Sequence, residues 1–173
     1  MRRLSAGLAL CCLVTVSASA ASPEGMQATF VDANGKNVGD ATLAQTPHGV
    51  LITARISGLP PGEHGFHLHE TGRCDAAGGF ESAGGHYAPR GKAHGFKAED
   101  GPHAGDMPNQ FVGSDGWLRA HVLNARVSIG GGAAALLDAD GSALVVHAGA
   151  DDYGSQPSGK AGKRLACAVI RRS

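Results

Sequence analysis

Apolar and polar residues alternate along several short segments of this chain, the pattern of β-strands that bury one face. The segment 50–56 shows it most clearly, because its apolar residues fall at every second position. Helical periodicity is absent after the first twenty residues, so an all-β chain is predicted. Further strands are predicted at Met26–Asp32, Asn37–Thr46, Trp117–Leu123, Ala143–His147 and Leu165–Ile170.

Turn-forming pairs separate the predicted strands, among them Asn34-Gly35 and Asp140-Gly141. The 27 glycines suit short strands joined by tight turns, which favours a β-sandwich or β-barrel. Two long stretches, 71–108 and 148–163, contain no predicted strand. Loops of this length inside a compact domain are usually functional or disordered, and these two carry most of the residues of chemical interest.

The first twenty residues have the organisation of a secretory signal peptide. Arg2 and Arg3 form a basic start, an apolar run follows over 4–16, and residues 18–20 read Ala-Ser-Ala, a cleavage site. The run is too short for a membrane-spanning helix. We predict a signal peptide over 1–20, one domain over 21–173, and export to the periplasm or the outside of the cell. Lipid attachment at Cys11 is an alternative that the preceding Leu10 fits poorly.

Removal of this segment changes the charge and the cysteine count. The chain has 15 Lys+Arg and 15 Asp+Glu, and loss of Arg2 and Arg3 leaves 13 against 15, a net charge near −2. That balance gives no basic face for nucleic acid and no polybasic patch for a membrane. Cys74 and Cys167 remain as an even pair, which in an oxidising compartment predicts one disulfide. Closing a loop of about 93 residues contributes at most ~4–5 kcal/mol.

Two histidines two positions apart, His67 and His69, are the first sign of chemistry. A strand places residues i and i+2 on the same face, so the two rings would lie side by side. Imidazole binds copper, zinc, iron and nickel, so the pair alone leaves the metal open. His147 ends a later predicted strand and would add a third nitrogen. A set of nitrogens alone favours Cu(II).

The stretch 71–108 holds a second set of donors, three nitrogens and one oxygen, which suits a closed tetrahedral zinc site. These residues are His86, His94, His103 and Asp106. The copper set is still one ligand short, and His86 has two ring nitrogens. One imidazole bound to both metals would therefore complete both sites.

Three other histidines are predicted not to bind metal. His64 precedes the first pair by three positions, so on a regular strand it faces the opposite side. His48 lies in a predicted turn, and His121 alternates with apolar neighbours and should point outward.

Several motifs are specific: Gly65-Phe66-His67-Leu68-His69, Gly84-Gly85-His86-Tyr87-Ala88-Pro89, His103-Ala104-Gly105-Asp106, Leu144-Val145-Val146-His147 and Arg164-Leu165-Ala166-Cys167. With them the chain resembles the copper/zinc superoxide dismutase family, in its secreted bacterial form, over essentially everything after the signal segment. The resemblance implies an eight-stranded Greek-key barrel that converts superoxide to dioxygen and hydrogen peroxide by Cu(II)/Cu(I) cycling. It implies one copper and one zinc per subunit, copper at His67, His69, His86 and His147, and zinc at His86, His94, His103 and Asp106.

The resemblance also implies roles for residues that bind no metal and for the bridging histidine. Asp151 would accept hydrogen bonds from His67 and His94, and Arg164 would hold the superoxide anion beside copper. His86 would carry a proton to the product, and His64 would join loops through backbone hydrogen bonds.

Two segments depart from the eukaryotic pattern of that family. The segment between residues 74 and 86 is longer. The loop between residues 147 and 164 is shorter and leaves only Lys160 and Lys163 to steer an anion. Eukaryotic dimer contacts do not transfer to the bacterial form, so the sequence allows a homodimer without predicting one.

Two other functions remain as alternatives. A metal store or delivery protein would need labile ligands or many methionines, and the chain has only three. A zinc hydrolase would need an open position on the metal, which four protein ligands do not leave.

Overall fold

The computed structural model describes residues 25–172, so the predicted signal peptide lies outside the described residues. The chain is all-β, as predicted, with one turn of 3-10 helix at Glu81–Ala83. The predicted bounds of β1, β2 and β8 are confirmed, and those of β3, β7 and β9 differ by one residue at one or both ends. The strands are β1 (Met26–Asp32), β2 (Asn37–Thr46), β3 (Gly49–Ile56), β4 (Gly62–His64), β5 (Phe66–His69), β6 (Gln110–Val112), β7 (Leu118–Asn124), β8 (Ala143–His147), β9 (Arg164–Val169) and β10 (Arg171–Arg172).

The structure has ten strands where eight were expected, because two passages of chain are interrupted. Gly65 separates β4 from β5: its N–H donates to the carbonyl of Gly149 and its carbonyl accepts the N–H of His147. Ile170 separates β9 from β10, and its N–H donates to the carbonyl of Ser142. Joining each interrupted pair gives eight passages. Strand β6 is not among the predicted strands, because it is too short to show alternation.

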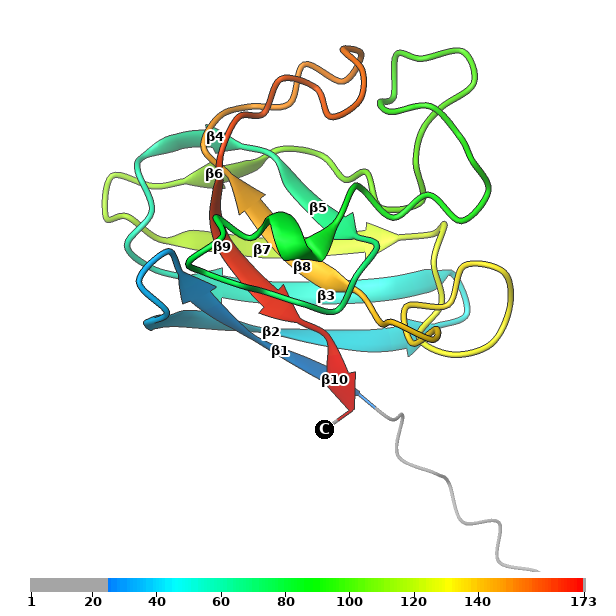
Figure 1. Cartoon of the computed structure of the whole chain (residues 1–173), viewed down its shortest axis with the longest axis horizontal. Coiled ribbons are helices and arrows are strands. Elements are labelled where there is room, and N and C mark those ends of the chain that lie inside the picture. The colour runs from blue at the N-terminus through cyan, green and yellow to red at the C-terminus, as the bar shows by residue number, and fades with distance from the viewer. Residues whose placement is uncertain (1–24, 173) are drawn as a thin grey trace, which may run out of the picture.

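The sheet is antiparallel and runs in the order β4-β6-β7-β3-β2-β1-β9-β8-β5. Its two end strands, β4 and β5, are consecutive along the chain on either side of Gly65. The chain therefore joins the two edges, and the sheet curls into a nearly closed barrel (Figure 1). The connection from β3 to β4 skips β7 and β6, as in a Greek key.

The interior of the barrel holds the main apolar core, and strand alternation decides which residues enter it. On β3 the predicted inward residues are all buried, and Ile52 lies opposite Leu43 on β2 and Val122 on β7. Phe30 and Phe66 are among the largest fully buried side chains, with ring centroids 6.4 Å apart. Burial of one such side chain stabilises the fold by about 1.5–3 kcal/mol.

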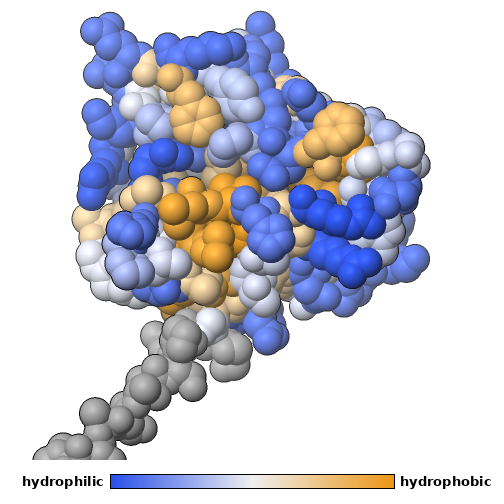
Figure 2. All heavy atoms as spheres, turned by 180° about the vertical axis from the view of Figure 1, so that it is seen from behind, coloured by the Kyte–Doolittle hydropathy of each residue, from blue (hydrophilic) through white to orange (hydrophobic). Residues whose placement is uncertain are grey.

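The outer face of the barrel is covered over β8 and β9. Over β8 and β9 the segment after β5, with its 3-10 turn, packs a second apolar cluster that includes Phe80, Val145 and Cys167 (Figure 1). The reverse view shows apolar side chains gathered at the surface between charged ones (Figure 2). Leu51 on β3 and Leu123 on β7 lie opposite each other and are exposed. The covered side is therefore where a site shielded from water can form.

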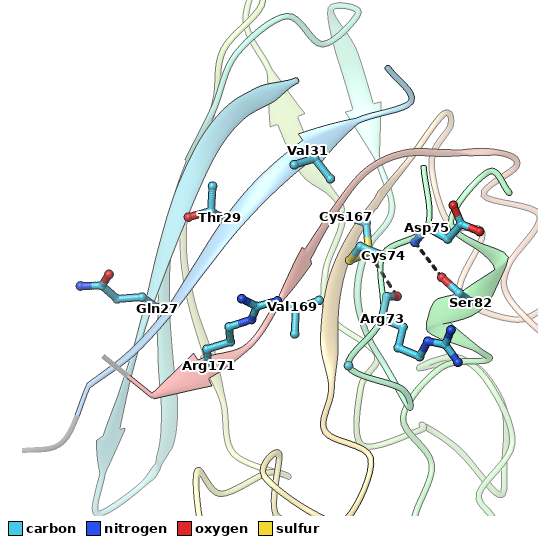
Figure 3. Close-up of a pocket in the computed structure, with 11 residues that line it drawn as sticks. Gln27, Thr29, Val31, Arg73, Cys74, Asp75, Ser82, Cys167, Val169 and Arg171 are labelled. Atoms are coloured by element: carbon cyan, nitrogen blue, oxygen red, sulfur yellow. Dashed lines mark hydrogen bonds between the residues drawn. A yellow bond between two sulfur atoms is a disulfide. The ribbon is translucent and has the colours of Figure 1, made fainter. Parts of the chain in front are cut away.

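The predicted disulfide is confirmed between Cys74 and Cys167, whose Cα atoms lie 5.7 Å apart. It ties the segment after β5 to the middle of β9. A cavity of about 710 Å³ lies beside it, lined by β1, β9, β10 and the segment around Arg73 (Figure 3). This cavity contains none of the predicted metal ligands, although it is larger than a cavity of about 400 Å³ that contains four of them. Cavity size therefore does not locate the site.

Within residues 25–172, no helix has the length and apolar character needed to cross a membrane.

We expect the double variant Cys74→Ser, Cys167→Ser to fold less stably by about 2–4 kcal/mol, because the cross-link restricts a loop of 93 residues in the unfolded chain. For a chain of this size that corresponds to a lower melting temperature by roughly 5–15 °C. Thermal unfolding of the metal-free protein followed by circular dichroism measures it. The wild-type protein with reductant should match the variant; equal melting temperatures with and without reductant would contradict the expectation.

Candidate metal centre

Strand β5 carries the first two histidines on the outside of the barrel. Phe66 and Leu68 point into the main core, so the alternating His67 and His69 point to the opposite face of the strand. The two histidines are nonetheless buried. β5 pairs with β8, and the register of β8 and β9 shifts between Val146 and His147. A shift of this kind re-aims side chains next to functional sites. It leaves Nε2 of His147 3.3 Å from Nε2 of His69.

The segment between β5 and β6 returns across this face and adds the remaining donors. An isolated bridge pairs His86 with His69, which brings the His86 ring 4.1 Å from the His67 ring between centroids. Two groups of donor atoms result, each with all its atoms within 4.8 Å of one another. We name the first the nitrogen cluster (His67, His69, His86 and His147) and the second the mixed cluster (His86, His94, His103 and Asp106).

The mixed cluster converges on one carboxylate oxygen. Nδ1 of His86, of His94 and of His103 lie 2.9, 3.0 and 3.3 Å from Oδ1 of Asp106. A tetrahedral site with ligand bonds of about 2.0–2.1 Å has its ligand atoms ~3.3–3.4 Å apart, so the four atoms are close to the spacing that a small cation requires. The other oxygen, Oδ2, accepts the backbone N–H groups of Gly95 and His103 and fixes the carboxylate.

In the nitrogen cluster one nitrogen of each ring is held by an oxygen, and the second nitrogens of His69 and His147 lie 3.3 Å from each other. The first nitrogen donates to an oxygen: His67 Nε2 to Asp151, His69 Nδ1 to the carbonyl of Gly84, His147 Nδ1 to the carbonyl of Gly162, and His86 Nδ1 to Asp106. Hydrogen bonds of this kind fix the tautomer and orientation of metal-binding histidines. His67 Nδ1 and His86 Nε2 are buried and have no hydrogen-bond partner among the described residues.

Asp151 links the two clusters. Its Oδ2 accepts from Nε2 of His67 at 2.9 Å and its Oδ1 accepts from Nε2 of His94 at 3.0 Å. Although burial alone would raise it, these hydrogen bonds lower the pKa of Asp151 to about 2. The carboxylate is therefore ionised at neutral pH, and one anion positions one ring of each cluster.

Three rings of the centre, those of His69, His86 and His147, are neutral at neutral pH because their pKa values are lowered. Burial lowers the pKa of His86 to about 4, and burial with the neighbouring His67 ring lowers the pKa of His147 to about 3. Burial also lowers the pKa of His69 well below its ordinary value. For Asp106, burial is outweighed by its His103 and His86 neighbours, which lower its pKa. Neutral imidazoles beside an ionised carboxylate are the protonation states that bind a metal cation.

Arg164 lies at the mouth of the nitrogen cluster. A cavity of about 400 Å³ is lined by His69, His86, His103, His147, Glu81 and Arg164 among others. The Arg164 guanidinium donates to the carbonyls of Phe80 at 2.6 Å and Gly84 at 2.7 Å, and lies 3.6 Å from the exposed carboxylate of Glu81. Lys160 and Lys163, the predicted steering cations, do not line this cavity.

Two side-chain amides hold the backbone of the site, and sequence reasoning missed both. Asn109 accepts the N–H of Asp151 and donates to its carbonyl, at 2.9 and 3.0 Å. Gln156 does the same for His94, at 3.0 and 2.9 Å. Each pair of hydrogen bonds joins residues far apart in the sequence, so no local sequence pattern predicts these contacts. Glu81 was missed for the same reason.

The three histidines predicted not to bind metal lie outside both clusters. His48 and His121 are exposed. His64 is buried, and its ring nitrogens lie 2.7 and 2.8 Å from the carbonyls of His147 and Pro60, which confirms its expected backbone contacts.

Comparison with known proteins gives a consistent result. A family model described as copper/zinc superoxide dismutase matches residues 14–170. The chain is 45% identical to superoxide dismutase [Cu-Zn] 2 of Aquifex aeolicus over 99% of this chain and 100% of that one. It is 34% identical to the Escherichia coli K12 enzyme of that name, over 99% and 100%. Among solved structures, a SOD-like protein from Bacillus subtilis aligns with a TM-score of 0.80 and 38% identity, covering 84% of this chain and 97% of that one. The clock protein EA4 aligns with a TM-score of 0.73 and 31% identity, covering 91% and 100%.

We expect Gly159→Ala to disturb the centre by displacing Asp151. A Cβ at residue 159 would overlap Oδ1 of Asp151 and approach His94 Nε2 to 2.7 Å. Gly91→Ala is the matched control, because its φ of +61° resembles the +67° of Gly159 and no atom lies within 4 Å of its Cβ position. The control should lose only the ~1–2 kcal/mol that a left-handed alanine costs.

Thermal unfolding and bound-metal analysis of the two purified variants measure the difference. Gly159→Ala should be clearly less stable than Gly91→Ala and should retain less metal. Equal metal content in the two variants would show that the hydrogen bonds of Asp151 do not support the centre.

Proposed function

This chain belongs to the copper/zinc superoxide dismutase family, and on that premise we propose that it disproportionates superoxide with copper in the nitrogen cluster and zinc in the mixed cluster. One observation carries the assignment. Two buried nitrogens, His67 Nδ1 and His86 Nε2, lack any partner among the described residues and belong to a set made of nitrogens alone. An all-nitrogen set suits Cu(II), and a set of three nitrogens and one carboxylate suits Zn(II).

His86 would hold both metals, because its two nitrogens belong to different clusters. Nδ1 lies 2.9 Å from Asp106 Oδ1, and the free Nε2 belongs with the nitrogen cluster. We assign Nδ1 to zinc and Nε2 to copper, with one ion of each per chain. Copper supplies one-electron redox chemistry between Cu(II) and Cu(I), whereas zinc has none.

The chain's own residues would supply anion binding and protons. The Arg164 guanidinium is a cation that lines the cavity containing His69, His86 and His147. Its hydrogen bonds to the carbonyls of Phe80 and Gly84 hold the guanidinium in place for a small anion. Nε2 of His86 is the buried atom that would take up a proton and give it to the reduced product. Asp151 would keep His67 and His94 oriented while that proton moves.

The complete ligand set favours an enzyme over a binding module. Among the solved structures that share the fold are a SOD-like protein and a clock protein, so the fold alone does not decide activity. The observation that favours turnover here is Arg164 at the mouth of a cavity lined by three of the nitrogen-cluster histidines. The mixed cluster has four protein donors, which leaves a hydrolase no open position on zinc.

The cell compartment follows from the same family and from the disulfide. The disulfide and the bacterial relatives are consistent with a periplasmic or secreted protein. We infer further that residues 1–20 are a signal peptide removed on export, and that 21–173 form the active domain. N-terminal sequencing of material exported by a bacterial host tests this inference, and a start at Met1 would contradict it.

We expect His86→Ala to uncouple the two metals while His67, His69 and His147 still bind copper. Electron paramagnetic resonance of the Cu(II) protein, recorded with zinc bound and after zinc removal, measures the coupling. The wild-type spectrum should change on zinc removal and that of the variant should not. His121→Ala, an exposed histidine outside both clusters, is the control and should behave as wild type. A wild-type spectrum indifferent to zinc would contradict a bridging imidazole.

We expect Arg164→Glu to slow superoxide consumption with both metals still bound. The change replaces attraction of the anion by repulsion, a difference of several kcal/mol at an effective dielectric near 20. Solvent screening reduces this to about 1–3 kcal/mol, roughly ten- to a hundredfold in rate. Arg164→Lys should be milder, because the charge remains and the planar fork is lost. Pulse radiolysis with metal analysis measures both, and full activity of a fully metallated Arg164→Glu would remove this residue from the mechanism.

Replacement of Glu81 tests the opposite change in charge beside Arg164, the removal of a negative charge. Its carboxylate lies 3.6 Å from the Arg164 guanidinium and lines the same cavity, so it opposes the attraction of an anion. Glu81→Gln should raise the rate about two- to fivefold at low salt, with the gain lost as salt rises. Glu63→Gln removes the same charge from a residue that does not line this cavity and should leave the rate unchanged. Equal responses of the two variants would exclude a local effect of Glu81.

A further inference from the structure

A second, smaller cavity lies against the loop that carries the mixed cluster, and its charged lining is entirely basic. It has a volume of about 160 Å³ and is lined by Arg90, Lys92 and Arg126, with small alanine, glycine and proline residues between them. No carboxylate lines it. It shares no residue with the cavity of Arg164.

The three cations form no ion pair with any residue in the range 25–172. Arg126 is exposed, lies over the Phe96 ring at 5.4 Å, and donates one hydrogen bond from its guanidinium, to the carbonyl of Asp106 at 2.6 Å. A guanidinium has five N–H donors, so most of those of Arg126 are not used by the protein. Three positive charges around a concave surface raise the local potential and attract an anion.

We propose that this cavity binds a small tetrahedral oxyanion of the inorganic phosphate class. The planar fork of arginine matches two oxygens of such an ion, and a lysine ammonium adds a point charge. At ~30 Å³ per water, the cavity holds about five waters, comparable to the five non-hydrogen atoms of phosphate. Nucleotides and other drug-sized ligands need roughly 300 Å³ or more, so the cavity selects a free ion.

The bound anion would also hold the loop of the mixed cluster. Arg90 and Lys92 lie between the ligands His86 and His94 in the sequence, whereas Arg126 follows β7. The backbone of Arg126 is held in place, because its backbone N–H donates to the side-chain oxygen of Asn124 at 2.9 Å. An anion shared by these cations would tie the 86–94 segment to the end of β7.

An anion bound there would also restrain the segment around Asp106, which is held by two hydrogen bonds to the end of β7 and the residues after it. The side chain of Asn124 donates to the carbonyl of Ala104 at 2.8 Å, and Arg126 donates to the carbonyl of Asp106. For zinc to leave, the loop that carries the mixed cluster would have to open. Opening would break these two hydrogen bonds. This coupling rests on the proposed zinc site, whereas anion binding does not depend on it.

Calorimetric titration of sodium phosphate into the metal-loaded protein, at ionic strength held constant with chloride, tests the binding. Wild type should show one saturable event at this cavity, and Arg90→Gln with Lys92→Gln should weaken it by about tenfold or more. Arg164→Gln removes the cation of the other cavity and should leave this event in place. Lys36→Gln with Arg55→Gln, two exposed cations elsewhere, is the control of equal net charge.

Loss of zinc to a colorimetric chelator tests the coupling. If only the closed loop binds the anion, phosphate at ten times its dissociation constant should slow zinc loss by up to about tenfold in wild type. Zinc loss from the Arg90→Gln, Lys92→Gln variant should not respond. The dismutase activity of this variant should equal that of wild type in phosphate-free buffer, because neither residue contacts either cluster.

Two results would overturn the proposed anion binding, and a third would overturn only its coupling to zinc loss. The first is absence of saturable phosphate binding by wild type. The second is binding that disappears in Arg164→Gln but persists in Arg90→Gln with Lys92→Gln, which would assign the ion to the other cavity. The third, normal binding with no change in zinc loss, would overturn the coupling alone. None of these results depends on turnover, so they are distinguishable from failure of the proposed dismutase function.

Discussion

Six imidazoles packed under two loops impose the constraint on which the rest of this structure depends. Burial holds the pKa values of His69, His86 and His147 below their ordinary values, so the rings stay neutral and present lone pairs. A lone pair buried without a donor costs free energy comparable to a lost hydrogen bond. Most of the remaining ring nitrogens already donate to protein oxygens. The free atoms need a cation or another donor to satisfy them, and the two sets of donor atoms are of the kind that could hold a metal ion.

The loops carry little regular structure, so their positions are set by a few specific links to the barrel. The disulfide fixes the first loop to β9, and Asn109 and Gln156 hold the backbones of Asp151 and His94. Asp151 in turn joins a ring of the nitrogen cluster to a ring of the mixed cluster. With His86 common to both clusters, the two clusters are joined at two points. We therefore expect a disturbance of one cluster to reach the other through Asp151 and His86.

The sequence predicts the parts of this molecule that depend on local periodicity or on residue type. Alternation located β1 and β2, an apolar run located β8, and the spacing of His67 and His69 with the donor types of the loop indicated both clusters. The interruption at Gly65 was not predictable, because it arises where one passage of chain changes pairing partner, from β6 to β8. The contacts of Asn109, Gln156 and Glu81 also escaped prediction. Each joins residues whose separation is fixed by tertiary packing, and the contacts of Asp151 were expected only through resemblance to a family.

The charge balance of the chain limits how substrate can be drawn to the site. Residues 21–173 contain 13 basic and 15 acidic residues, a net charge near −2 that repels an anion weakly. Attraction must come from within about one Debye length, ~10 Å at moderate salt, of the cavity mouth. There Arg164 is opposed by Glu81 at 3.6 Å, and neither Lys160 nor Lys163 lines the opening. The local field is therefore the difference between one fixed, hydrogen-bonded cation and one exposed carboxylate. Because Glu81 is exposed and Arg164 is not, water screens the carboxylate more strongly, and the net field at the mouth favours an anion.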